Sequence, residues 1–232
     1  MSILAEVFGR TKILLPVVHV ADEEQALRNT DVARDAGADG VFLINHGMSY
    51  DRLLDIHRVV HARHADWWIG VNCLDLYPVE VMQIADDTIA GIWVDNAMID
   101  EDADEQPEAE AVLEVRRQKG WNGLYFGGVA FKYQRPVNDL ARAATVAARF
   151  MDVVTTSGPG TGLAAEQEKI RIMKQALGDR PLAIASGITP ENIADYLPVA
   201  DAFLVATGIS RSFEELDPER AARLAQTIHA SS

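Results

Sequence analysis

The stretch 181-PLAIASGITPENIADYLPVADAFLVATGIS-210 decides the fold. Residues 181–186 and 202–207 are almost continuous apolar runs of strand length, which is typical of parallel strands buried on both faces. Between them, Thr189-Pro190-Glu191-Asn192 indicates the start of a helix, with an N-cap, a proline at the first helical position and an acid in the first turn. The stretch therefore predicts a strand, a helix and a second strand.

The same alternation recurs along the chain about once every 29 residues, the length obtained when 232 residues are divided among eight units. The other predicted strands are 13–20, 40–46, 67–74, 91–96, 123–131 and 152–157. Eight such units predict a single (β/α)8 TIM barrel domain over residues 1–232. An open doubly wound sheet also alternates strands and helices. The count of eight and the absence of a GxGxxG motif after the first strand favour the barrel.

Local signals refine this pattern. Asp217-Pro218-Glu219 predicts the start of the last helix, and Gly37, Gly120 and Gly178 lie where helices are expected to end. Pro16 falls within the predicted strand 13–20. Because proline is disfavoured in a paired strand, we expect it at a strand start or an irregularity.

The charge balance is acidic, with 35 Asp and Glu against 21 Lys and Arg and a formal net charge of −14. This balance argues against binding to nucleic acid or to an anionic membrane, since both need a basic surface. It does not exclude a small anionic ligand, which responds to local N–H groups. The single cysteine, Cys73, excludes an intrachain disulfide, and the apolar run 13–20 is too short to span a bilayer. We expect a cytoplasmic protein.

Half of the net charge lies in residues 100–110, which contain seven acids and no base. This segment is interpretable as a cation site, as a flap over the barrel mouth, or as a solvated loop that leads into a helix. The last interpretation is favoured, because acids stabilise the first turn of a helix.

In a TIM barrel the active site lies at the carboxyl ends of the strands. The segments after the last three predicted strands are rich in glycine and hydroxyl groups, and glycine allows backbone N–H groups to approach phosphate oxygens. We therefore predict a phosphate site made by Ser157, Gly158, Gly160, Thr161, Gly162, Ser186, Gly187, Ile188, Thr207 and Gly208.

The first half of the chain supplies candidate reactive groups. If the strand 123–131 is regular up to its end, Lys132 shares a face with Gly128 and Ala130, and its amine points into the barrel mouth. There it could act as an acid, as a base or as a nucleophile that forms a Schiff base. The alternative interpretation is that Lys132 is a solvent-exposed surface residue. Asp95 is a candidate general base or partner of Lys132, and its alternative is a loop cap.

Two further residues complete the predicted catalytic group. Asn72 and His19 follow strands and are expected to orient the substrate. A metal site made by His19, His46, Asp75 and Asp95 would draw its ligands from four separate strands, and nothing in their spacing demands it. We predict no resident metal, with Mg²⁺ as the cofactor left open.

These residues resemble the BtpA family of barrels, named for a role in photosystem I biogenesis. The resemblance is carried by residues 182–210, by His19 in PVVHV, by IGVNCL at 69–74 and by Lys132 in AFKYQ. It implies a phosphate-binding barrel similar to the ribulose-phosphate-binding barrels, and a homo-oligomer. Some relatives carry labels such as phosphoribosyltransferase.

Together these observations predict an enzyme that acts on a small phosphorylated metabolite, a sugar phosphate or phosphoribosyl compound, with transferase, isomerase or lyase chemistry. The alternative is a non-catalytic assembly or biogenesis factor on a TIM-barrel scaffold. In that case residues 100–110 would be a docking surface for a basic partner.

Overall fold

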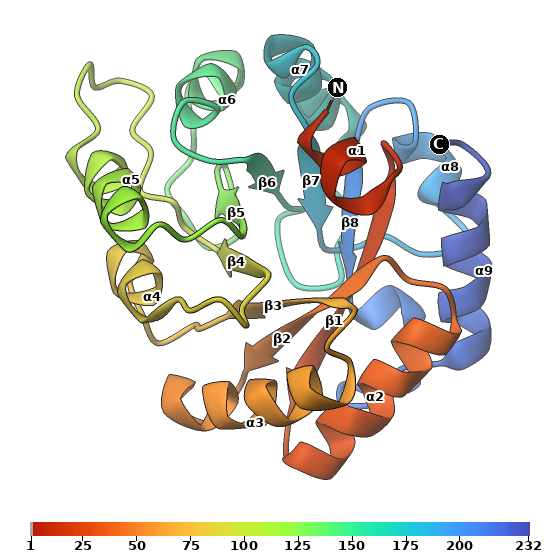
Figure 1. The fold of residues 1–232 in the computed structure, drawn as a ribbon. Coiled ribbons are helices and arrows are strands. Elements are labelled where there is room, and N and C mark those ends of the chain that lie inside the picture. Colours follow the sequence, from red (N-terminus) through yellow and green to blue (C-terminus); the bar gives the residue numbers. More distant parts are fainter. Residues whose placement is uncertain (1) are drawn as a thin grey trace.

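A computed structural model describes residues 2–232 and shows eight parallel strands in consecutive order, with β8 closing on β1 (Figure 1). The closed barrel confirms the predicted (β/α)8 fold over the open sheet. The strands are β1 (Ile13–Val20), β2 (Gly40–Asn45), β3 (Trp68–Asn72), β4 (Gly91–Val94), β5 (Leu124–Gly128), β6 (Val153–Thr156), β7 (Leu182–Ala185) and β8 (Ala202–Val205).

Helices surround this barrel. They are α1 (Ile3–Phe8), α2 (Glu23–Asp35), α3 (Tyr50–Arg63), α4 (Pro78–Ile84), α5 (Pro107–Lys119), α6 (Leu140–Ala147), α7 (Gln167–Leu177), α8 (Ile193–Tyr196), the 3-10 turn η1 (Thr207–Ile209) and α9 (Pro218–His229). Within residues 2–232, no helix is both long enough and apolar enough to cross a membrane.

The strands are buried on both faces, as their apolar runs predict. Along β1, Ile13, Leu15 and Val17 belong to the cluster inside the barrel, whereas Leu14 and Val18 belong to the cluster between the strands and the helices. This period of two places alternate residues in two separate cores. Position parity within a strand therefore decides which side chains reach the barrel mouth.

Pro16 lies inside β1, so its predicted place at a strand start or irregularity is wrong. Residues up to Pro16 pair with β8, and pairing with β2 begins at Val17. Pro16, which has no N–H group, therefore lies where the hydrogen-bonding partner of β1 changes from β8 to β2. This exchange explains how a proline is accommodated in a buried strand.

The helix signals are confirmed except at α8. Asp217 caps α9 by accepting from the N–H groups of Glu219 and Arg220, and Gly120 ends α5 in the left-handed conformation. By contrast, α8 begins at Ile193 and not at Pro190. The Thr189 hydroxyl accepts from the N–H groups of Glu191 and Asn192, and this hydrogen bonding holds a turn ahead of the helix.

The helix α1 closes the amino-terminal end of the barrel. Leu4 is fully buried in the interior cluster beside the strand-starting residues Ile13 and Ala202, and Phe8 packs on Trp68 with ring centroids 5.5 Å apart. Figure 1 shows α1 lying close to β1, β7 and β8. A ligand can therefore reach the interior only from the carboxyl-terminal end.

Large aromatic rings fill the interior because glycines on neighbouring strands leave room for them. A Cβ atom at Gly91 would lie 2.2 Å from Trp68 Cζ2, which is far inside van der Waals contact. We expect Gly91→Ala to lower the free energy of unfolding in urea by about 1–3 kcal/mol, the usual cost of overpacking a core.

The matched control is Gly160→Ala, because its new Cβ would lie 3.3 Å from the flexible Leu163 side chain and 3.7 Å from the Tyr133 hydroxyl, with no backbone atom as near. We expect this variant to change the free energy of unfolding by less than about 0.5 kcal/mol. Equal losses in both variants would contradict the role of Gly91 in packing.

Candidate active site

A cavity of about 300 Å³ lies at the carboxyl-terminal ends of the strands. Its volume is at the lower end of the range for small-molecule sites, roughly 300–1,000 Å³. Every strand or the loop that follows it contributes to the lining, and β3 contributes only through Leu74 in its loop. The lining residues are Val17, His19, Ile44, His46, Leu74, Trp93, Asp95, Lys132, Tyr133, Thr161, Gly162, Ala185, Ser186, Leu204, Ala206, Thr207 and Phe213.

Apolar side chains of the barrel interior form one part of this lining. Val17, Ile44, Trp93, Ala185 and Leu204 line the cavity and belong to the interior cluster. The indole Nε1 of Trp93 is buried and has no hydrogen-bond partner within residues 2–232. A ligand in the cavity thus rests directly on the packed core.

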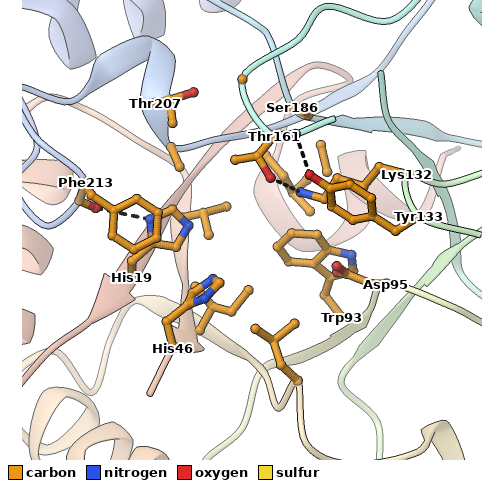
Figure 2. Close-up of a pocket in the computed structure, with 17 residues that line it drawn as sticks. His19, His46, Trp93, Asp95, Lys132, Tyr133, Thr161, Ser186, Thr207 and Phe213 are labelled. Carbon is orange, nitrogen blue, oxygen red and sulfur yellow. Dashed lines mark hydrogen bonds between the residues drawn. The ribbon is translucent and has the colours of Figure 1, made fainter. Parts of the chain in front are cut away.

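Titratable side chains at or after the ends of β1, β2, β4 and β5 surround the cavity. Figure 2 shows His19, His46, Asp95 and Lys132 around the same space as Trp93. Burial lowers the pKa of His46, and the nearby Lys132 charge lowers it further, whereas the Asp95 charge opposes this shift. The mouth therefore combines imidazole, carboxyl and amine groups within one cavity.

Asn72 does not line this cavity but forms a hydrogen bond to Asp95, which does line it. Asn72 is 1% exposed, and its Nδ2 donates to Asp95 Oδ1 over 2.9 Å. Burial raises the pKa of Asp95, whereas the Asn72 hydrogen bond and the Lys132 and His46 charges lower it. The predicted substrate-orienting role of Asn72 is thus replaced by a contact to Asp95.

We expect Asn72→Ala to raise the pKa of Asp95 further, because the variant removes a hydrogen bond that stabilises the carboxylate. A carboxyl-detected NMR titration would measure this shift, with the exposed Asn122→Ala as control. Because the pKa of Asp95 in the folded state is raised above its ordinary value of 3.8, the free energy of unfolding falls as the pH rises from 3.8 through the folded-state pKa. The variant should extend this pH range upward. An unchanged Asp95 titration would contradict the assignment.

Lys132 reaches the cavity from a loop, so its predicted place on a strand face is wrong. The strand β5 ends at Gly128, and Ala130 and Tyr133 take positive φ angles of 48° and 64°. Lys132 Nζ donates to Thr161 Oγ1 over 3.5 Å, and its backbone N–H donates to Ser157 Oγ over 2.8 Å. No carboxylate among residues 2–232 lies within 4.0 Å of the amine, so it forms no close ion pair with Asp95.

Four of the ten predicted phosphate residues line the cavity, opposite the imidazole groups. They are Thr161 and Gly162 after β6, Ser186 after β7, and Thr207 after β8. In Figure 2 Thr161 lies beside Lys132 and Tyr133, and its N–H donates to the Tyr133 hydroxyl over 3.4 Å. This side of the cavity thus presents hydroxyl groups and glycine backbone.

The other six, Ser157, Gly158, Gly160, Gly187, Ile188 and Gly208, are buried beneath the loops. A Cβ atom at Gly158 would lie 2.0 Å from a backbone atom of its own loop, and Cβ atoms at Gly187 and Gly208 would lie 2.3 and 1.8 Å from backbone atoms of the preceding loop. Ser157 Oγ accepts from Lys132 N and donates to Gly158 O. These glycines allow the loops to pack backbone against backbone.

Several cavity residues escape the sequence prediction. Trp93 stands two residues before Asp95 on the same strand face, so position parity could have revealed it. Tyr133 and Phe213 belong to loops and carry no such signal, and the sequence suggests His46 only as a metal ligand. Phe213 is 52% exposed and stacks on His19, with ring centroids 4.1 Å apart.

Lys169 in α7 also escapes the prediction. Its Nζ donates to Ser157 O over 2.8 Å and to Ala130 O, and burial lowers its pKa to about 8. One ammonium group therefore ties together the loop that carries Lys132 and the loop that carries Thr161.

Within residues 2–232, no group of three or more His, Cys, Asp or Glu side chains is arranged to hold a metal ion. Asp75 instead accepts from Asn45 Nδ2 over 2.8 Å and from Tyr50 N over 3.0 Å. Two imidazoles and one carboxylate that only share a cavity do not define a coordination site.

The acidic segment 100–110 leads into α5, with Glu108 and Glu110 in the first helical turn, as the favoured interpretation predicts. It is not fully solvated, however. The Glu101 side chain is fully buried, and Arg135 pairs with it over 2.5 Å and with Asp100 over 2.8 Å. The hydrogen bond from Arg135 lowers the pKa of Glu101.

Comparison with known proteins gives a family and a fold. A model of the BtpA family matches residues 19–230. An uncharacterized protein of Pyrococcus abyssi is similar at 23% identity over an alignment of 229 positions that covers 88% of this chain and 86% of that protein.

Two solved structures illustrate the fold. Phosphoribosyl anthranilate isomerase from Thermus thermophilus has a TM-score of 0.67 and 16% identity, over 95% of this chain and 100% of that one. The (S)-3-O-geranylgeranylglyceryl phosphate synthase from Thermoplasma acidophilum, in complex with sn-glycerol-1-phosphate, has a TM-score of 0.67 and 15% identity over 98% of both chains. At these identities the likeness concerns the fold.

Proposed function

The chain belongs to the BtpA family, and on this premise we propose that its barrel mouth is the active site of an enzyme for a small phosphorylated metabolite, either a sugar phosphate or a phosphoribosyl compound. The main support for this proposal is that one cavity has hydroxyl groups along one part of its lining and titratable groups along another. Thr161, Ser186 and Thr207 stand on one side, and His19, His46 and Asp95 stand on the other.

The first half suits a phosphate group. Hydroxyl groups and glycine backbone donate hydrogen bonds to phosphate oxygens, and the Lys132 amine beside Thr161 adds a positive charge there. Barrel enzymes often hold phosphate in the loops after the seventh and eighth strands. Both similar structures named above carry a phosphorylated compound in their names, which supports the same ligand class for this chain.

The second half suits acid–base chemistry on the rest of the ligand. Lys132 is the proposed acid, base or nucleophile, because its amine reaches the cavity on a flexible stem. Asp95 is its proposed partner, and Asn72 positions Asp95. Transferase, isomerase and lyase reactions all use such groups.

The assembly-factor alternative stays a prediction from the sequence. No contact in the described part of the chain favours it, and Arg135 already neutralises part of the acidic segment that would form the docking surface.

Phosphate recognition predicts that ribose 5-phosphate binds and that ribose does not. Isothermal titration calorimetry, with and without Mg²⁺, would measure both affinities. We expect Thr161→Val and Thr207→Val each to weaken binding about 10- to 100-fold, because a hydrogen bond to a charged group contributes roughly 1.5–3 kcal/mol.

The control is Thr145→Val, which removes an exposed hydroxyl from α6. Equal affinities for ribose and ribose 5-phosphate would contradict phosphate recognition. Unchanged affinities in both threonine variants would contradict the assignment of the loops.

The role of Lys132 predicts that Lys132→Ala loses turnover by about 10²-fold or more, since acid–base groups typically contribute 10²–10⁴-fold. ³¹P NMR of a panel of phosphorylated sugars and nucleotides incubated with the enzyme would identify a convertible substrate and then follow the variant. The exposed Lys119→Ala should retain full activity. An unchanged kcat in Lys132→Ala would remove Lys132 from the mechanism.

A further inference from the structure

Neighbouring groups fix the orientation of the His19 side chain in the cavity. It lies on the interior face of β1, two residues after Val17, and is 9% exposed. Its ring stacks on Phe213 at 4.1 Å with an interplanar angle of 12°, and the edge of His46 meets it at 4.9 Å and 90°. Phe213 thus covers one face of the ring, and His46 packs against it at a right angle.

The hydrogen bonding of His19 fixes its tautomer. Nδ1 lies 3.1 Å from the backbone carbonyl oxygen of Phe213, which can only accept a hydrogen bond. Nδ1 must therefore carry the proton. In the neutral ring Nε2 is then the unprotonated nitrogen, and Figure 2 shows this second nitrogen on the side turned to the cavity.

Hydrogen bonds from α2 hold the loop that carries Phe213, at the residues that follow it. Gln25 Nε2 donates to Glu214 O over 2.6 Å, and Asn29 Nδ2 donates to the same oxygen over 2.8 Å. Asn29 Oδ1 also accepts from Leu216 N over 2.7 Å. Because Gln25 and Asn29 are both buried, the loop after β8 is a fixed wall of the cavity and keeps its carbonyl on His19.

The charge state of His19 agrees with this geometry. Its pKa is lowered to about 4, chiefly by burial; the charges of His46 and Lys132 contribute to the lowering, and the hydrogen bond to the Phe213 carbonyl opposes it. The ring is therefore neutral near pH 7. Such a weakly basic ring is a poor proton carrier at neutral pH but a good hydrogen-bond acceptor.

We propose that His19 is a specificity-determining residue that presents a permanent acceptor, Nε2, to an O–H or N–H donor of the ligand. This inference rests on the proposed function for the identity of the ligand, and it adds the requirement that the ligand place a hydroxyl group, such as that of a sugar, against β1. A site built around a buried acceptor discriminates strongly against analogues that lack the matching donor.

The first test needs no ligand. Two-bond ¹H–¹⁵N correlation spectra of the whole protein, with His19 assigned from the His19→Asn variant, report the proton on each ring nitrogen. We expect Nδ1 protonated and Nε2 unprotonated from pH 5 to pH 9. A proton on Nε2 at pH 7, in the other tautomer or in the imidazolium, would overturn the proposal.

The second test compares two amides at position 19 by calorimetry with ribose 5-phosphate. Glutamine places an amide near the position of Nε2, whereas asparagine reaches only the position of Nδ1. We expect His19→Asn to weaken binding about 10- to 100-fold and His19→Gln to weaken it less than about 5-fold. Thermal unfolding of each variant would confirm that it folds.

Equal losses in the two variants would overturn the acceptor role. The failures of the two proposals are distinguishable. If the wild-type protein binds neither ribose 5-phosphate nor phosphate, the proposed function fails, whereas the ring spectra still decide whether His19 is an acceptor.

Discussion

The site depends on the filling of the barrel interior by aromatic rings. The Phe42 ring lies 5.1 Å from that of Trp68, 5.7 Å from that of Trp93 and 5.3 Å from that of Phe126. Glycines on neighbouring strands leave the space that these rings occupy. A barrel filled in this way is a packed core, not a pore. The candidate active-site cavity therefore lies above Trp93, where the strand ends bring distant segments of the chain together.

This constraint explains the chemical division of the mouth. The units from β1 to β5 contribute imidazole, carboxyl and amine groups, and the last three units contribute hydroxyl groups and glycine. The two halves meet where Lys132 donates to Thr161, and Lys169 ties the loops that carry them. On the opposite side, the carbonyl of Phe213 fixes His19. Backbone carbonyls thus orient His19 and Lys169, and such contacts cannot be predicted from the order of side chains in the sequence.

How far the sequence predicts this site depends on where each residue lies. Regular strands obey a period of two, so the barrel and the inward positions of His19 and Asp95 follow from the apolar runs. Lys132 lies beyond the end of β5, where the positive φ of Ala130 breaks that period, and its position follows from the loop alone. Phe213 contacts His19 from the loop after β8, and Lys169 contacts two loops from α7, so the roles of both depend on the folded structure. The predicted glycine loops do converge, but most of their glycines face protein backbone, a distinction that needs coordinates.

The central claim is that one cavity holds the phosphate on its hydroxyl side and the rest of the ligand on its imidazole side. A crystal structure of the protein with ribose 5-phosphate tests this most directly. We expect phosphate density within hydrogen-bond distance of Thr161, Ser186 and Thr207, with the sugar toward His19. Phosphate density only at the opposite end of the barrel, where Arg116, Arg149 and Arg180 line another hollow, would contradict it.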